Sequence, residues 1–250
     1  MTELRSLVIV LGDQLDLDAA AFDGFDVAVD AVWMAEVNDE STHVWSSKPR
    51  TAMFLAAMRH FALALKGAGR PLHYTRLDAP GNCGSLAAQL HADIERLRPS
   101  QLVLTAPGDW RVLQLLKAVA AANQLPLDIR EDRHFFSTVR EFAAHANGRK
   151  SLRMEYFYRE QRKRHRVLMQ GDMPVGDRWN FDIDNREAFE AAGPGALPPR
   201  IHFEPDTTTR NVIAMVNTLF AQPPGRLDSF SWPVTRTQAL QSLQVFIQKR

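Results

Sequence analysis

Three carboxylates, Asp13, Glu36 and Glu40, could bind one small polar ligand together, because they follow two short apolar runs of the chain. The carboxyl ends of parallel strands meet at one edge of an open α/β sheet, and ligands bind there where the strand order reverses. If the two runs are neighbouring strands, the carboxylates converge and can accept hydrogen bonds from a ribose, a ribityl chain or a ring N–H. Taken singly, Asp13 could equally cap a turn, and Glu36 and Glu40 could be solvated. Their convergence favours a pocket.

The first apolar run, Leu7–Leu11, is the element around which we expect the chain to be organised. It shows no polar alternation, which is typical of a strand buried on both faces of a parallel sheet. Gly12 then frees the backbone to turn. We therefore expect Asp13 and Gln14 to lie just beyond the end of a central strand.

Four more apolar runs alternate with segments of helical periodicity. This alternation, with short turns between the segments, predicts a five-stranded parallel Rossmann-like sheet with helices on both faces. Ser47 is a good N-cap for the first long helix, and Pro49 suits its first turn. The other strands are expected at 31–35, 72–77, 101–105 and 127–130, and the helices at 47–67, 86–97 and 109–123.

The composition changes near residue 136, and from Ser137 onward the sequence predicts helices and loops with no clear strand. We expect an α/β domain at 1–135, interdomain helices and a loop at 136–200, and further helices at 201–250. Because the last amphipathic helix reaches the end of the sequence without a cap or turn, we expect the chain to be a fragment. The later helices are expected at 137–145, 152–169, 210–220 and 236–249.

Several protein classes are excluded by composition. The single cysteine, Cys83, excludes an internal disulfide and any Cys-rich metal site built from this chain alone. The eight histidines lack the spacing of a zinc site, and Gly12 stands alone, so neither a dinucleotide fingerprint nor a P-loop is present.

No window holds the roughly 18 apolar residues of a membrane span, and the first residues do not form a signal peptide, so we expect a cytoplasmic protein.

Residues 149–166 are the most basic part of the chain, with eight Lys or Arg among 18 residues. Residues 1–148 hold 14 Lys/Arg and 18 Asp/Glu, a net charge of −4, whereas residues 149–250 hold 16 and 11, a net charge of +5. Only the second part therefore suits a phosphate polymer. A solvated basic face explains the pattern equally well. The interleaved Tyr156, Phe157 and Tyr158 fit a helix core better than a base-stacking surface.

Seven short motifs follow one another along the chain. They are Leu11-Gly-Asp-Gln-Leu15, Met34-Ala-Glu-Val37, Ala57-Met-Arg-His-Phe61, Pro107-Gly-Asp-Trp-Arg111, Gly148-Arg-Lys-Ser-Leu152, Met154-Glu-Tyr-Phe-Tyr-Arg-Glu160 and Arg178-Trp-Asn-Phe-Asp182. In this order they resemble the photolyase/cryptochrome family, and more narrowly its bacterial photolyase-related branch, which carries an iron–sulfur cluster and includes prokaryotic (6-4) photolyases. The resemblance runs from about residue 5 to about residue 246.

The resemblance implies that the α/β domain binds an antenna chromophore, typically a ribityl-lumazine in this branch. It also implies a helical domain that begins at 201–250 and binds FAD and a four-cysteine [4Fe–4S] cluster. Photoexcited reduced FAD would donate an electron to a pyrimidine dimer or (6-4) lesion flipped out of damaged DNA. The FAD pocket and the cluster cysteines of the family lie beyond the point matching Arg250. The chain would then be the antenna part of a DNA-repairing lyase, and would not repair DNA alone.

The resemblance also assigns residues. Glu40 matches the chromophore-facing glutamate of the family, and Phe54 matches a side chain that packs on the ring. The chain departs from the family at His43, where a tyrosine is usual, and at Ser46–Arg50, where two histidines and lysines are usual. The expected antenna pocket consists of Gly12, Asp13, Gln14, Glu36, Glu40 and Phe54, and no metal site is expected.

DNA contacts are expected outside this pocket. Asp182 and Arg186 match positions in the interdomain loop of the family that approach lesion-bearing DNA. The basic segment adds the expected phosphate contacts Arg149, Lys150, Arg162 and Lys163.

Two alternatives remain from the sequence. The first is a non-catalytic α/β module that holds a small ligand, or none, and touches nucleic acid through the basic helix. The second is a nucleotide-binding fold of the stress-protein type, against which the missing glycine-rich phosphate loop counts.

Overall fold

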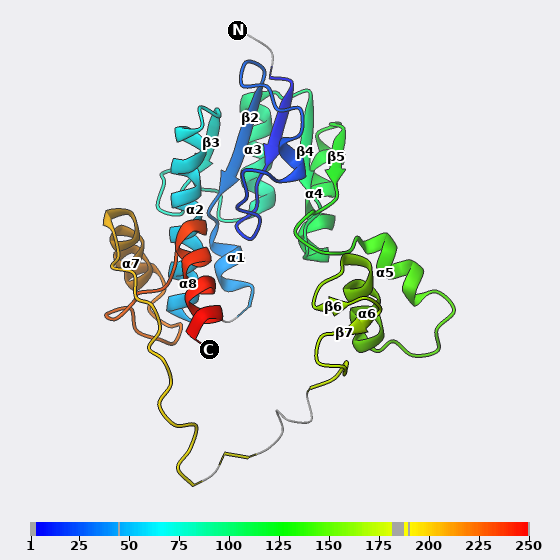
Figure 1. The fold of residues 1–250 in the computed structure, drawn as a ribbon. Coiled ribbons are helices and arrows are strands. Elements are labelled where there is room, and N and C mark those ends of the chain that lie inside the picture. The colour runs from blue at the N-terminus through cyan, green and yellow to red at the C-terminus, as the bar shows by residue number, and fades with distance from the viewer. Residues whose placement is uncertain (1–3, 45, 182–187, 190, 250) are drawn as a thin grey trace. The chain divides into compact units, whose positions relative to one another are not determined.

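The computed structural model describes residues 4–44, 46–181, 188–189 and 191–249. The chain forms two compact units (Figure 1). The first comprises Met1–Glu131 together with Arg200–Arg250, and the second comprises Asp132–Pro199. The segment that follows Pro199 therefore packs with the α/β part of the chain, and its assignment to a separate helical domain stays a prediction.

A five-stranded parallel sheet lies at the centre of the first unit, with strand order β3-β2-β1-β4-β5 (Figure 1). The central strand is β1 (Ser6–Ile9), between β2 (Asp30–Ala35) and β4 (Gln101–Thr105), and the edges are β3 (Leu72–Thr75) and β5 (Leu127–Arg130). The strand order reverses at β1. The prediction of a five-stranded parallel sheet with a central first strand is confirmed.

Both faces of the sheet are buried. Successive residues of β1 point to opposite sides, so its apolar side chains enter the core on each face. Leu7 and Ile9 belong to a core cluster shared with α3 and α4, whereas Val8 belongs to a cluster shared with α2 and α7. The helices of this unit are α1 (Asn38–Thr42), α2 (Lys48–Gly67), α3 (Leu86–Leu97), α4 (Trp110–Ala122), α7 (Thr207–Leu219) and α8 (Arg236–Lys249), with a 3-10 turn at Ala20–Phe22.

Side chains cap the first turn of several helices, and Ser47, the N-cap that the sequence predicts, is one of them. The Ser47 hydroxyl accepts a hydrogen bond from the Arg50 amide, and Asp109 accepts one from the Arg111 amide, so each satisfies a donor that the first turn leaves open. Asp39 and Glu40 lie in the short helix α1, which is not among the helices expected from the sequence. Within the described residues, no helix is long and apolar enough to cross a membrane.

The segment after Pro199 completes one face of the core. Val212 and Val216 of α7 are fully buried against α2. The carbonyl of Pro224 accepts a hydrogen bond of 2.8 Å from the Lys48 amide at the start of α2. No described residue of α8 is buried, and its large apolar side chains, such as Leu243 and Ile247, are exposed.

The described part of the second unit combines helices, a short hairpin and loops. It contains α5 (Val139–Ala146), α6 (Met154–His165) and the antiparallel strands β6 (Met169–Gln170) and β7 (Met173–Pro174), which the sequence did not indicate. The helix expected to reach residue 169 ends at His165. It ends there because Arg166 adopts a left-handed conformation, with φ of 53°, which an α-helix does not continue.

One carboxylate is held inside the core by three donors. Asp93 of α3 accepts hydrogen bonds from the indole N–H of Trp33 at 2.9 Å, from Gln89 at 2.9 Å and from Arg96 at 2.5 Å. Burial alone would raise the pKa of Asp93, but the hydrogen bonds from Gln89, Arg96 and Trp33 outweigh it. The pKa of Asp93 therefore lies below its ordinary value.

We predict that Asp93→Asn lowers the free energy of unfolding at pH 7 by about 2 kcal/mol, the usual contribution of hydrogen bonds to a charged acceptor. Because the folded-state pKa is depressed, the carboxylate stabilises the fold fully above the unfolded-state value of about 3.9, and this contribution is lost as the pH falls through the folded-state value. Urea unfolding followed by tryptophan fluorescence measures the free energy of unfolding of both proteins. The difference between wild type and variant should narrow from pH 7 to about pH 2.

The matched control is Asp128→Asn, because Asp128 is a half-exposed carboxylate paired with Arg130 on β5. This control should lower stability by less than about 1 kcal/mol. If the difference in free energy of unfolding between wild type and Asp93→Asn stayed constant with pH, the role given to the Asp93 charge would be contradicted.

Candidate functional site

A cavity of about 320 Å³ opens at the carboxyl ends of β1 and β2. Its size lies at the lower end of the range typical of small-molecule sites, about 300–1,000 Å³. Gly12 and Asp13 line it from the loop after β1, and Glu36 lines it from the end of β2. Glu40 of α1 and Phe54 of α2 complete the five predicted antenna residues that the structure brings together there.

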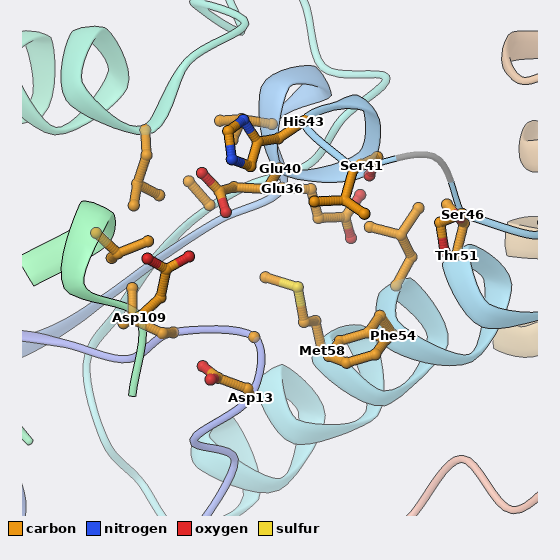
Figure 2. A pocket seen from close by; sticks show the side chains of 18 of the residues that line it. Asp13, Glu36, Glu40, Ser41, His43, Ser46, Thr51, Phe54, Met58 and Asp109 are labelled. Atoms are coloured by element: carbon orange, nitrogen blue, oxygen red, sulfur yellow. The ribbon is translucent and has the colours of Figure 1, made fainter. Parts of the chain in front are cut away.

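The cavity has a polar side and an apolar side. In Figure 2 the carboxylates of Asp13, Glu40 and Asp109 lie on one side, and the side chains of Phe54 and Met58 lie on the facing side. Such a lining suits a flat ring that presents hydrogen-bonding groups along one edge and an apolar face to α2.

Gly12 lets Met58 approach the loop after β1. A Cβ atom at Gly12 would lie 3.1 Å from the sulfur of Met58, closer than an ordinary contact. A side chain at this position would push Met58 into the cavity or away from the loop. The close approach of a side chain, rather than an unusual φ angle, therefore favours glycine here.

Gln14 does not line the cavity, although the sequence placed it in the pocket. Its amide nitrogen donates hydrogen bonds to the carbonyls of Thr105 at 3.3 Å and Ala106 at 3.0 Å, at the end of β4. The side chain is buried, so it ties the loop after β1 to the neighbouring strand. Gln14 thus holds the loop that carries Asp13.

Glu36 lines the cavity, but its carboxylate is occupied by the protein. Both oxygens pair with Arg59 of α2, at 2.8 Å to Nε and 2.9 Å to Nη2, and the hydroxyl of Tyr74 and the amide of Leu77 also donate to them. Burial lowers the pKa of Arg59, but the Glu36 carboxylate outweighs it and the pKa is raised. Burial and the same carboxylate raise the pKa of Tyr74.

Glu40 pairs with Arg111, a residue that the sequence placed only in a motif. The two Nη atoms of Arg111 donate to the Glu40 oxygens at 2.9 and 2.8 Å, and Asp109 lies 3.4 Å from Nη2. The backbone amide and guanidinium of Arg111 lower the pKa of Asp109, and the Glu40 carboxylate raises the pKa of Arg111. A sequence signal for this pair was available. Arg111 lies in the first turn of the helix that follows β4, and that helix begins at the same edge of the sheet.

We predict that Glu36→Gln lowers the free energy of unfolding by about 3 kcal/mol, because it leaves Arg59 as a buried charge without its main partner. The matched control is Glu40→Gln, which breaks an exposed pair and should change stability by less than about 1 kcal/mol. Urea unfolding of both variants measures the difference. If the two variants were equally stable, Glu36 would not be a structural anchor of the pocket.

The basic segment forms part of the second unit, where its arginines make internal contacts. Arg162 is only 6 % exposed and donates to the carbonyls of Val167 and Leu168. Arg149 pairs with Glu160 at 3.1 Å. Arg162 therefore supports the turn after α6 and does not offer its guanidinium to a phosphate, contrary to the sequence-based assignment.

Three of the predicted DNA-contacting residues are exposed cations, Arg149 among them. Lys150 and Lys163 lie on the surface, and the ammonium of Lys163 lies 5.5 Å from the Trp179 ring centroid. Phe157 is buried against Phe142, as expected for a core residue, but Tyr156 and Tyr158 are 46 % and 49 % exposed. Asp182 and Arg186 lie outside the described residues.

The sequence matches the family model of deoxyribodipyrimidine photo-lyase-related proteins over residues 8–232. The chain is also 44 % identical over 245 residues to a (6-4) photolyase of Agrobacterium fabrum (strain C58 / ATCC 33970). That alignment covers 98 % of this chain and 48 % of the relative, so the chain spans about half the length of the curated relative that it matches.

Proposed function

The chain belongs to the family of deoxyribodipyrimidine photo-lyase-related proteins, and on that premise we propose that it is the antenna-binding part of a light-driven DNA-repair protein. The observation that carries this proposal is the cavity at the point where the strand order reverses, with carboxylates on one side and Phe54 and Met58 on the other. Ligands of open α/β sheets bind at this point.

A ribityl-lumazine fits the chemistry of the lining. Glu40 and Asp13 can accept hydrogen bonds from ribityl hydroxyls, and the aromatic ring of Phe54 offers a face for the heterocycle. When bound, such a chromophore absorbs light and passes the excitation energy to a flavin. The residues His43 and Ser46, where the chain departs from the family pattern, also line the cavity and would adjust the fit.

The iron–sulfur cluster requires residues that this chain does not supply. A [4Fe–4S] cluster held by cysteines needs four thiolates, and the chain has one cysteine, Cys83, which is exposed. The cluster therefore does not fit this chain. We assign the FAD site and the repair of a pyrimidine dimer or a (6-4) lesion to the part of the relatives' length that this chain does not span.

A second candidate function is a non-catalytic module that binds nucleic acid. The exposed Lys163 favours it, because the exposed rings of Tyr156 and Tyr158 lie in the same helix, α6, and the exposed Lys150 lies shortly before that helix. Lysines neutralise phosphates, and exposed aromatic rings can stack on bases. This activity is compatible with the antenna function, because in our proposal the full-length protein acts on damaged DNA.

An absorption spectrum of the purified chain, with mass spectrometry of whatever denaturation releases, tests the antenna proposal directly. A released ribityl-lumazine, or binding when the compound is added, is the expected result. Failure to bind either a ribityl-lumazine or riboflavin would reject the antenna proposal for this chain.

We predict that Glu40→Ala weakens the binding of ribityl-lumazine about tenfold, because a hydrogen bond to a charged group contributes about 1.5–3 kcal/mol. Quenching of ligand fluorescence measures the affinity, and thermal unfolding should show an unchanged fold. The matched control is Glu95→Ala, since Glu95 is an exposed glutamate outside the cavity lining. Equal affinities of Glu40→Ala and wild type would remove Glu40 from the site.

We predict that the double variant Lys150→Glu/Lys163→Glu weakens binding of duplex DNA. Its plot of log K against log salt should be flatter by about 0.9 for each phosphate that the variant no longer neutralises. Fluorescence anisotropy at several KCl concentrations gives both quantities. The matched control is Lys66→Glu/Lys117→Glu, which changes the charge equally on α2 and α4. A slope that the first double variant leaves unchanged would mean that this basic face is only solvated.

A further inference from the structure

The turn at residues 79–84 is joined to two neighbouring strand ends by the side chain of Asn82. The amide nitrogen of this side chain donates hydrogen bonds to the carbonyl of Glu36, at 2.7 Å, and to the carbonyl of Arg76, at 2.9 Å. Glu36 directly follows β2, and Arg76 directly follows β3. Both N–H groups of the amide are therefore used, and they connect the carboxyl ends of two adjacent strands.

The oxygen of the same amide fixes the turn itself. It accepts a hydrogen bond of 2.9 Å from the Gly84 amide, two residues further along, which is the arrangement of an Asx-turn. Gly84 has a φ of 78°, a left-handed conformation that residues with a side chain rarely adopt. Because the nitrogen of Asn82 faces two carbonyls and its oxygen faces an N–H, a single orientation of the amide satisfies all three hydrogen bonds.

Gly84 in turn holds the short helix α1. Its carbonyl accepts a hydrogen bond of 3.1 Å from the amide of Asp39, which lies in the first turn of this helix. The N-cap residue of α1 is Val37, whose side chain has no oxygen to accept such a bond. No residue of α1 is buried, so an apolar face does not anchor the helix. The Gly84 carbonyl therefore takes the place of a capping side chain.

The residues of α1 and those directly after it form one wall of the cavity. Glu40 and Ser41 belong to α1, His43 follows it, and all three line the cavity (Figure 2). Asn82 does not line the cavity. It therefore acts on a ligand only through the contacts that run from its side chain to Gly84 and from Gly84 to α1.

From these contacts we propose that Asn82 is a positioning residue of the cavity, which keeps α1 in place so that Glu40 meets the ribityl hydroxyls of the ligand. The inference rests on the proposed antenna function and adds a residue that acts on the ligand without touching it. Because α1 is in place before the ligand arrives, most molecules are competent to bind, and little entropy is lost in ordering this wall.

The experiment measures the affinity of wild type, Asn82→Ala and Asn82→Asp for ribityl-lumazine by fluorescence titration. Asn82→Ala should weaken binding about tenfold, because the apparent affinity falls in proportion to the binding-competent fraction. Asn82→Asp keeps the acceptor for the Gly84 amide but sets a carboxylate against two carbonyls, so it should weaken binding at least as much. Aspartate forms the same turn, so wild-type affinity of Asn82→Asp would show that the link to the strand ends is not needed, and would overturn the inference.

Two further readouts separate positioning from a general loss of stability. The double variant Asn82→Ala/Glu40→Ala should bind about as weakly as Glu40→Ala, because both changes remove the same contact, whereas independent effects would multiply to a loss of about a hundredfold. In the ligand-free chain, hydrogen exchange at the Asp39 amide should be faster in Asn82→Ala than in wild type, while exchange in β4 stays unchanged.

The matched control is Asn123→Ala. Like Asn82, Asn123 is half-buried, and its amide nitrogen donates to a backbone carbonyl, that of Val119, at 2.8 Å. It lies at the C-terminal end of α4, outside the cavity lining, so the control should bind as tightly as wild type. Circular dichroism confirms that each variant is folded. Asn82→Ala should fold, because the Cys83 amide still holds the turn to Gln89 of α3, at 3.0 Å.

The outcomes separate this inference from the proposed function. If wild type binds neither ribityl-lumazine nor riboflavin, the antenna function fails and the inference fails with it. If wild type binds and Asn82→Ala binds equally well, the inference is overturned while the antenna function stands. Losses that multiply in the double variant, or an exchange rate of the Asp39 amide that Asn82→Ala leaves unchanged, would also overturn it.

Discussion

The buried pair of Glu36 and Arg59 is the interaction on which the cavity depends. It joins the end of β2 to α2, and Arg59 extends the connection to Asp78 at 3.2 Å and to the sulfur of Met215 in α7 at 3.1 Å. Two charges inside a core are stabilising only when they are well paired and hydrogen bonded, and here Tyr74 and Leu77 complete the set. One ion pair therefore anchors a wall of the cavity and also contacts α7, whose packing on α2 is apolar.

The polar residues of the cavity come from separate elements, so their positions depend on anchors of this kind. Asp13 follows the central strand, Glu40 lies on a five-residue helix, and Arg111 lies in the first turn of α4. A five-residue helix has little stability of its own. Its position is set by contacts such as the bidentate pair of Glu40 with Arg111, so the site is assembled by tertiary interactions rather than by one local motif.

The sequence predicted the sheet well, because a buried parallel strand has a distinctive signal. The unbroken run Leu7–Leu11 and the capping residues Ser47 and Asp109 depend on local chemistry that is readable along the chain. The pairing of Glu36 with Arg59 depends on residues 23 positions apart, and that of Glu40 with Arg111 on residues 71 positions apart. Single-sequence patterns carry no information on such pairs, so the sequence did not indicate that Glu36 pairs with Arg59 or that Glu40 pairs with Arg111. The same limitation hid the internal role of Arg162.

The contact between Gly12 and Met58 makes the width of the cavity depend on one flexible side chain. A methionine side chain is unbranched, and its thioether is polarisable, so it fills irregular gaps and packs well against aromatic rings. Ring systems of different width can therefore be accommodated by a change of the Met58 rotamer while the sheet stays fixed. The same sulfur is also open to oxidation, which would convert an apolar wall into a polar one. Under the proposed antenna function, in which the ligand absorbs light in the presence of oxygen, the working lifetime of the site would be limited by the chemistry of this thioether.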